Sequence, residues 1–166
     1  MLVPANDETA ALPISGTAVP FDEISGDDNE DTLLLKGMAE DALRFVRSRS
    51  WCLATHRHFF VDGVAGIVAI CLFEVTIRGY SGNQWIWAFT GDIPRAYMLV
   101  ESYRTPYAAL TCYIDGLEAW AKEAQHGRTS PHLIPVNVPP TPEYAAMAFS
   151  RVETLRNHIL PNIRRS

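Results

Sequence analysis

Apolar residues follow different periods in successive parts of this chain. From Asp31 they recur at spacings of three and four, which predicts a helix that ends near Ser50. Residues 51–77 are rich in aromatic and β-branched side chains and predict two strands, with an Asp-Gly hairpin turn at 62–63. The second strand is apolar on both faces, so we expect it in the centre of a sheet.

Two more strands complete the predicted sheet. They span 85–90 and 96–101, on either side of a Gly-Asp-Ile-Pro corner at 91–94. The connection at 78–84 is rich in turn-forming residues, and every connection is short. The predicted sheet is therefore an antiparallel four-stranded meander.

Two C-terminal helices begin with the same dipeptide. The Thr-Pro pairs at 105–106 and 141–142 each supply an N-cap hydroxyl and a proline at the first helical position. The apolar stripes that follow end at Gly127 and Pro161. Between these helices, the four prolines of 130–141 predict an extended surface segment. The predicted fold class is α+β, with the sheet packed by one N-terminal and two C-terminal helices.

Charge divides the chain into two parts. Residues 1–31 carry eight of the 19 acidic residues and none of the 14 basic ones, and they show no helix or strand period. This composition is typical of a flexible segment. We therefore predict an acidic arm over 1–30, whose removal leaves the fold intact, and a single globular domain over 31–166.

Composition also bears on compartment and partners. The longest basic run is the pair 164–165, so nucleic-acid binding is not expected. The charge-free apolar run 64–73 is too short to cross a bilayer, and the N-terminus has no basic signal-peptide region, so we expect a cytoplasmic protein without membrane contact. Cys52, Cys71 and Cys112 lack metal or disulfide spacing and are expected to be reduced and mostly buried; a catalytic cysteine stays open.

A metal site is the first chemical candidate. His56 and His58 are two residues apart, so a regular strand would place them on one face, with Asp62, Asp92 or His132 as a third ligand. Solvent-facing histidines explain the same pattern with fewer requirements. We therefore predict no metal and no cofactor.

Paired carboxylates are the second chemical candidate. Asp92 at the corner and Glu101 at the end of the next strand are the best placed, although an Asp in a turn usually accepts backbone hydrogen bonds. Glu143 most simply complements a helix dipole. The chain has no G-x-S-x-G, G-x-G-x-x-G, Walker or H-E-x-x-H motif. No catalytic residue is assigned.

Aromatic and arginine residues gather around the Gly-Asp-Ile-Pro corner. Trp85 and Trp87 are two apart on one strand and should share a face, either as core under a helix or as a partner-binding patch. Core is the favoured interpretation. Tyr, Trp and Arg are also enriched at protein interfaces. The candidate binding residues are Trp85, Trp87, Asp92, Arg95, Tyr97, Arg104 and Trp120.

Two motifs carry a family resemblance. The patterns W-I-W-x-x-x-G-D-I-P-x-A-Y, from 85, and I-P-V-N-x-P-P-T-P-E, from 134, resemble a DUF-type family of short, acidic, cytosolic bacterial proteins. The likeness covers about 34–160 and implies an immunity-protein-like role beside a toxin, with no catalytic residue to carry over. The pattern-bearing residues are Trp85, Trp87, Gly91, Asp92, Pro94, Tyr97, Pro135, Asn137, Pro139 and Pro140.

The predicted function is non-enzymatic binding of a protein partner. Its concrete form is an immunity protein that neutralises a toxin in the bacterial cytoplasm, with a basic toxin suited to the acidic arm. The alternative is a small metal- or carboxylate-dependent hydrolase or transferase that uses the region of His56, His58 and Asp92. A third possibility is an adaptor that forms a homodimer through an exposed sheet edge.

Overall fold

The computed structural model describes residues 12–14 and 16–165. Residues 1–11 and 15 of the predicted arm lie outside the described residues. The main elements are the strands β1 (Val19–Pro20), β2 (Cys52–Val64), β3 (Val68–Ile77), β4 (Asn83–Gly91) and β5 (Ala96–Leu99), and the helices α1 (Asn29–Arg47), α2 (Pro106–Ala124) and α3 (Pro142–Thr154). A π-helical turn, Leu155–Ile159, and a 3-10 turn, Leu160–Asn162, continue α3.

The sheet is an antiparallel meander in the order β1-β2-β3-β4-β5. The predicted α+β class, with three helices on an antiparallel sheet, is confirmed. The predicted number of four strands is wrong, because Val19 and Pro20 pair with Phe60 and Phe59 and so add a fifth strand at the β2 edge. A two-residue strand has too few residues to show a period in the sequence.

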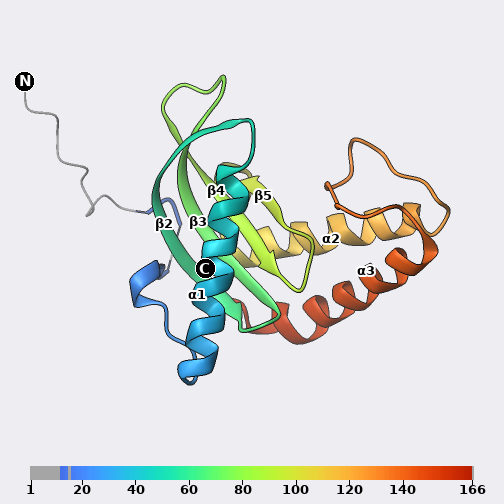
Figure 1. Cartoon of the computed structure of the whole chain (residues 1–166), viewed down its shortest axis with the longest axis horizontal. Helices are drawn as coiled ribbons and strands as arrows, with labels where there is room; N and C mark the ends of the chain where they lie inside the picture. Colours follow the sequence, from blue (N-terminus) through green and yellow to red (C-terminus); the bar gives the residue numbers. More distant parts are fainter. Residues whose placement is uncertain (1–11, 15, 166) are drawn as a thin grey trace, which may run out of the picture.

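Helices cover both faces of the sheet. Alternate residues of β3 point to opposite sides, so Leu72 packs with α2 and α3 in one core, whereas Phe73 packs with α1 in the other. Figure 1 shows α1 across one face, and α2 and α3 extending beyond the β5 side of the sheet. Cys71 is fully buried in the α1 core, and this burial raises the pKa of its thiol. The prediction that β3 is central and apolar on both faces is confirmed.

The β2–β3 hairpin turns later than the sequence predicts. Ala65 and Gly66 lie in the turn, with Gly66 at a φ of 78°, and the amide of Ile67 donates to the carbonyl of Val64 at 2.9 Å. Gly63 lies inside β2 opposite Ala69, where a Cβ would sit 2.4 Å from a backbone oxygen of β3. The glycine of the Asp-Gly pair therefore permits close strand approach and does not form the turn.

Side-chain caps set the starts of the helices. Thr105 and Thr141 accept hydrogen bonds from the amides of Ala108 and Tyr144, so both predicted Thr-Pro starts are confirmed. Helix α1 begins earlier than predicted because Asp28 is its N-cap and accepts from the amide three residues later at 2.8 Å.

Part of the predicted arm belongs to the fold. Beyond the β1 pairing, Phe21 lies edge-on to Phe73 with ring centroids 6.0 Å apart, and Ile24 is buried in the α1 core. Arg164 near the C-terminus donates to the backbone oxygens of Thr17 and Val61. The acidic composition of this segment gave no sign that Val19, Phe21 and Ile24 contact the folded domain. Deleting 1–30 would also remove the α1 cap, so we no longer expect that deletion to leave the fold intact.

None of the helices in the described ranges combines the length and apolarity needed to cross a membrane.

The structure predicts that Ile24→Ala lowers the free energy of unfolding by about 3 kcal/mol, because Ile24 is 3% exposed and its truncation leaves a cavity. The matched control is Leu33→Ala on α1, where the leucine is 71% exposed and a change within about 0.5 kcal/mol is expected. Chemical denaturation of the two variants measures this. Equal stabilities would show that the segment before α1 contributes nothing to the core.

Candidate functional site

An open groove of about 1090 Å³ lies where several elements meet. Its lining comes from the end of α1 and the turn after it (45–51), the β4–β5 corner and β5 (91–97), the segment before α3 (135–138), α3 itself (144–151) and Trp120 of α2. Helix α1 covers one face of the sheet, and α2 and α3 cover the other. A groove lined from both faces must pass around the sheet edge, and on this side that edge is β5.

Aromatic side chains form much of the wall on the α1 side. Trp51 and Tyr97 have ring centroids 4.5 Å apart, and Phe45 lies 6.2 Å from Tyr97. The indole N–H of Trp51 is buried and has no hydrogen-bond partner in the described part of the chain. On the opposite wall, Tyr144 and Met147 of α3 are exposed. The groove therefore presents apolar surface on both sides.

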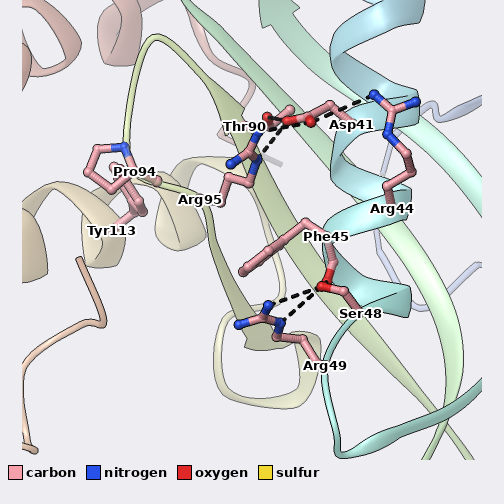
Figure 2. Close-up of polar contacts among 9 residues, drawn as sticks. All are labelled: Asp41, Arg44, Phe45, Ser48, Arg49, Thr90, Pro94, Arg95 and Tyr113. Carbon is pink, nitrogen blue, oxygen red and sulfur yellow. Dashed lines mark hydrogen bonds and ion pairs between the residues drawn. The ribbon is translucent and has the colours of Figure 1, made fainter. Parts of the chain in front are cut away.

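A bidentate ion pair holds α1 to the β4–β5 corner. Arg95 donates from Nε and Nη2 to the Asp41 carboxylate at 2.7 and 2.9 Å, and the buried hydroxyl of Thr90 donates to the same carboxylate at 2.7 Å (Figure 2). The hydrogen bond from Arg95 is the largest cause that holds the pKa of Asp41 below its usual value; burial opposes this, and Thr90 reinforces it. Arg44 lies 3.8 Å from the carboxylate and adds a weaker attraction.

A second ion pair holds α3 to the same corner. Arg151 donates to the Asp92 carboxylate at 3.1 Å and to its backbone oxygen at 3.3 Å. On the α2/α3 face of the sheet, the buried Tyr113 hydroxyl donates to the Pro94 oxygen at 2.7 Å, and the Tyr113 ring stacks on Phe89. Burial raises the pKa of Tyr113, so the hydroxyl stays protonated as a donor. The corner is thus tied to α1, α2 and α3.

Arg49 differs from the other two groove arginines. Its guanidinium lies 4.7 Å from the Phe45 ring centre and donates to the Ser48 hydroxyl (Figure 2). Within residues 12–14 and 16–165, it forms no ion pair with a carboxylate. A cation that lies on an aromatic ring and lacks an acidic partner remains available to an external anion.

The structure divides the candidate binding residues into two groups. Asp92, Arg95, Tyr97 and Trp120 line the groove. The others lie elsewhere: Trp85, Trp87 and Arg104.

Trp85 and Trp87 share the α2/α3 face of the sheet, as predicted. Trp87 is fully buried and donates from Nε1 to the Tyr103 oxygen at 2.6 Å, so it is core. Trp85 is partly buried beneath the Arg57 guanidinium, 4.8 Å from its ring centre. Arg104 is exposed outside the groove, just after the 3-10 turn Val100–Ser102.

The predicted common face of His56 and His58 is wrong. The β2–β3 register shifts between Thr55 and His58, where β2 has one residue more than β3. This bulge interrupts the alternation of side chains. His56 consequently hydrogen-bonds Thr76 at 2.7 Å, whereas His58 packs against Phe73 on the α1 face. Burial, with a smaller contribution from a nearby arginine, lowers the pKa of His58.

The histidines are also far from the corner. His58 pairs with Phe73 and Gly91 with Val68, so the two positions are five residues apart along β3, or about 17 Å at roughly 3.4 Å per residue. Asp92, next to Gly91, therefore cannot share a small ligand with His58. Across the described residues, no three His, Cys, Asp or Glu side chains are grouped to hold a metal ion.

Sequence patterns missed much of the groove. Arg49 and Trp51 lie about 100 residues before Met147 and Arg151, and no spacing rule joins these two segments. Asp41 lies inside the predicted helix, where no motif sets it apart from the other polar residues. Trp51, which directly follows the arginines at the end of the predicted helix, was the local signal for the α1 side of the groove.

Comparisons of the chain with family models, with curated proteins and with solved structures find no match. The resemblance described from the two motifs stays a prediction.

We predict that Asp41→Asn lowers the free energy of unfolding by about 1.5 kcal/mol at pH 7, because charge-assisted hydrogen bonds from Arg95 and buried Thr90 are weakened. The folded-state pKa of Asp41 is lowered, so its contribution is present above the usual Asp value of about 3.9 and is lost as pH falls through the folded pKa. The difference between wild type and variant should therefore shrink below about pH 3.9, as urea denaturation across pH would measure.

The matched control is Asp115→Asn on α2, which removes the charge of an exposed carboxylate that pairs with Arg156. We expect a loss below about 0.5 kcal/mol for this change. Equal effects of the two substitutions, or an Asp41 effect that does not vary with pH, would contradict a structural role for the Asp41 pair.

Proposed function

We propose that this protein binds a protein partner in the groove beside β5 and performs no bond-making there. The observation that carries the proposal is the lining, in which Trp51, Tyr97, Tyr144 and Met147 present apolar surface. Arginine and aromatic side chains are the residue types that most often dominate binding energy at interfaces. Arginines of the same groove surround this surface.

The ion pairs at the corner support a binding role through preorganisation. Asp41 with Arg95, and Asp92 with Arg151, fix the relative positions of the two walls. A partner then meets surfaces that lose little freedom on association, which favours affinity. Each pair also occupies a carboxylate that an acid–base mechanism would need free.

An immunity protein that neutralises a toxin is the concrete form of this proposal. It rests on the motif resemblance and stays a prediction. The acidic residues of 22–31 lie at the start of α1, and the groove lies at its other end, about 28 Å away at 1.5 Å per residue. A basic region of a partner would suit the acidic end, and the groove would take a different region of that partner.

The test is site-specific photocrosslinking with benzoylphenylalanine in cells of the source organism. Positions Tyr144 (37% exposed) and Met147 (50%) lie in the groove, and Tyr80 (51%) and Leu53 (55%) are matched controls outside it. We expect a one-to-one covalent adduct with a single protein from both groove positions and from neither control, identified by mass spectrometry.

Equal adducts from groove and control positions would indicate nonspecific contact and overturn the proposal. So would adducts from the control positions alone. As a further check, Met147→Glu should weaken binding of the identified partner at least about tenfold, since a charge would be buried against apolar surface, whereas Leu53→Glu should leave it unchanged.

A further inference from the structure

We propose that the occupant of the groove is an extended, acidic peptide segment of the partner, which lies along β5 as an added strand. This inference rests on the proposed function and specifies the conformation and charge of what binds.

The free edge of β5 is the first observation. β5 is the last strand of the sheet, and β4 is the neighbour with which it pairs. Among the described residues, no backbone hydrogen bond outside the helices and strands involves 96–99. The outward-facing N–H and C=O groups of an edge strand are a template for another strand. The groove runs past this edge, with Tyr97 in its wall.

The opposite side of the groove also offers unpaired amide groups. Residues 136–138 belong to no helix or strand, and no backbone hydrogen bond joins them to the rest of the described chain. Asn137 is exposed in the groove lining, and its carboxamide has no hydrogen-bond partner within the described ranges. A carboxamide carries a donor and an acceptor side by side, which matches the N–H and C=O of an extended peptide.

Charge selects an acidic occupant. The charged groove residues are Arg49, Arg95, Arg151 and Asp92. Asp92 is paired with Arg151, and Arg95 with Asp41 outside the lining, which leaves Arg49 without a carboxylate among the described residues. Arg49 is held on the Phe45 ring, and its guanidinium can bind a carboxylate in bidentate geometry. An acidic side chain of the peptide therefore has a defined counter-charge.

The shape favours a peptide over a compact small molecule. Pockets for small ligands enclose most of the ligand and have volumes of about 300–1,000 Å³. This groove, of about 1090 Å³, is open to solvent and passes around the sheet edge. A second copy of the chain pairing through β5 is the competing occupant, and the test below distinguishes it.

The experiment selects binders to the purified full-length chain from a displayed library of random 12-residue peptides. We expect enriched peptides to combine Asp or Glu with apolar residues at alternate positions, because successive side chains of a strand point to opposite sides. For the best peptide, Arg49→Gln should weaken the affinity about tenfold by isothermal titration calorimetry, as loss of one charge-assisted pair implies. Arg128→Gln, on an exposed arginine outside the groove, should leave it unchanged.

N-methylation of single peptide amides tests strand addition directly. Removing an N–H that faces β5 should weaken binding at least about tenfold, and methylation of the intervening residues should have little effect, because only alternate amides of a strand face the same neighbour. The same pattern should disappear if the peptide binds as a helix. A peptide that is helical when bound, or affinity that is insensitive to methylation at every position, would overturn the inference.

Sedimentation at micromolar and millimolar concentration addresses the competing occupant. We expect a monomer throughout. A dimer that Tyr97→Arg disrupts would show that a second copy occupies the edge, and would overturn the inference. A selection that yields no binder, or binders without acidic residues, would also overturn it.

The two proposals can fail separately. Groove-specific crosslinking to a partner, together with no alternating methylation pattern, would retain partner binding and reject strand addition. Absence of groove crosslinks, together with peptides that bind along β5, would reject the cellular partner and retain the peptide preference of the groove.

Discussion

The position of the β4–β5 corner depends on the carboxylate of Asp41. One helix side chain accepts two hydrogen bonds from Arg95 and one from a threonine that is 2% exposed, so α1 and the corner cannot move independently without leaving charged or buried polar groups unsatisfied. With Arg151 on Asp92 and Tyr113 on Pro94, the corner is fixed from three helices. These anchors fix the positions of the elements that line the groove.

The location of the groove follows from how the sheet is covered. α1 packs on one face, and α2 and α3 pack on the other, but β5 has only four residues and no strand beyond it. The edge is therefore left between two layers of helix. Exposed edges are usually protected by charge or by covering elements. Here arginines and aromatic rings of the groove lining lie beside the edge that the proposed peptide would use.

Local rules predicted the elements more successfully than the site. The Thr-Pro starts, the central strand β3 and the shared face of Trp85 and Trp87 follow from capping and alternation, which act over a few residues. The prediction that His56 and His58 share a face is wrong because a bulge at 56–57 interrupts the alternation of side chains along β2. The acidic composition of 1–30 gave no sign of single buried anchors such as Ile24, because an average over a segment says little about one residue.

The sequence by itself determined the fold class, the starts of α2 and α3 and the apolar faces, because hydrophobic period and capping chemistry are encoded over short stretches of chain. Only the tertiary structure decided which side chains share a surface. Arg49, Asp92 and Asn137 come from three segments that no periodicity relates, and the packing of α1 and α3 against the corner places all three in one groove. The pairing of two of the groove's arginines with carboxylates, and the lack of such a partner for the third among the described residues, is likewise a consequence of long-range packing.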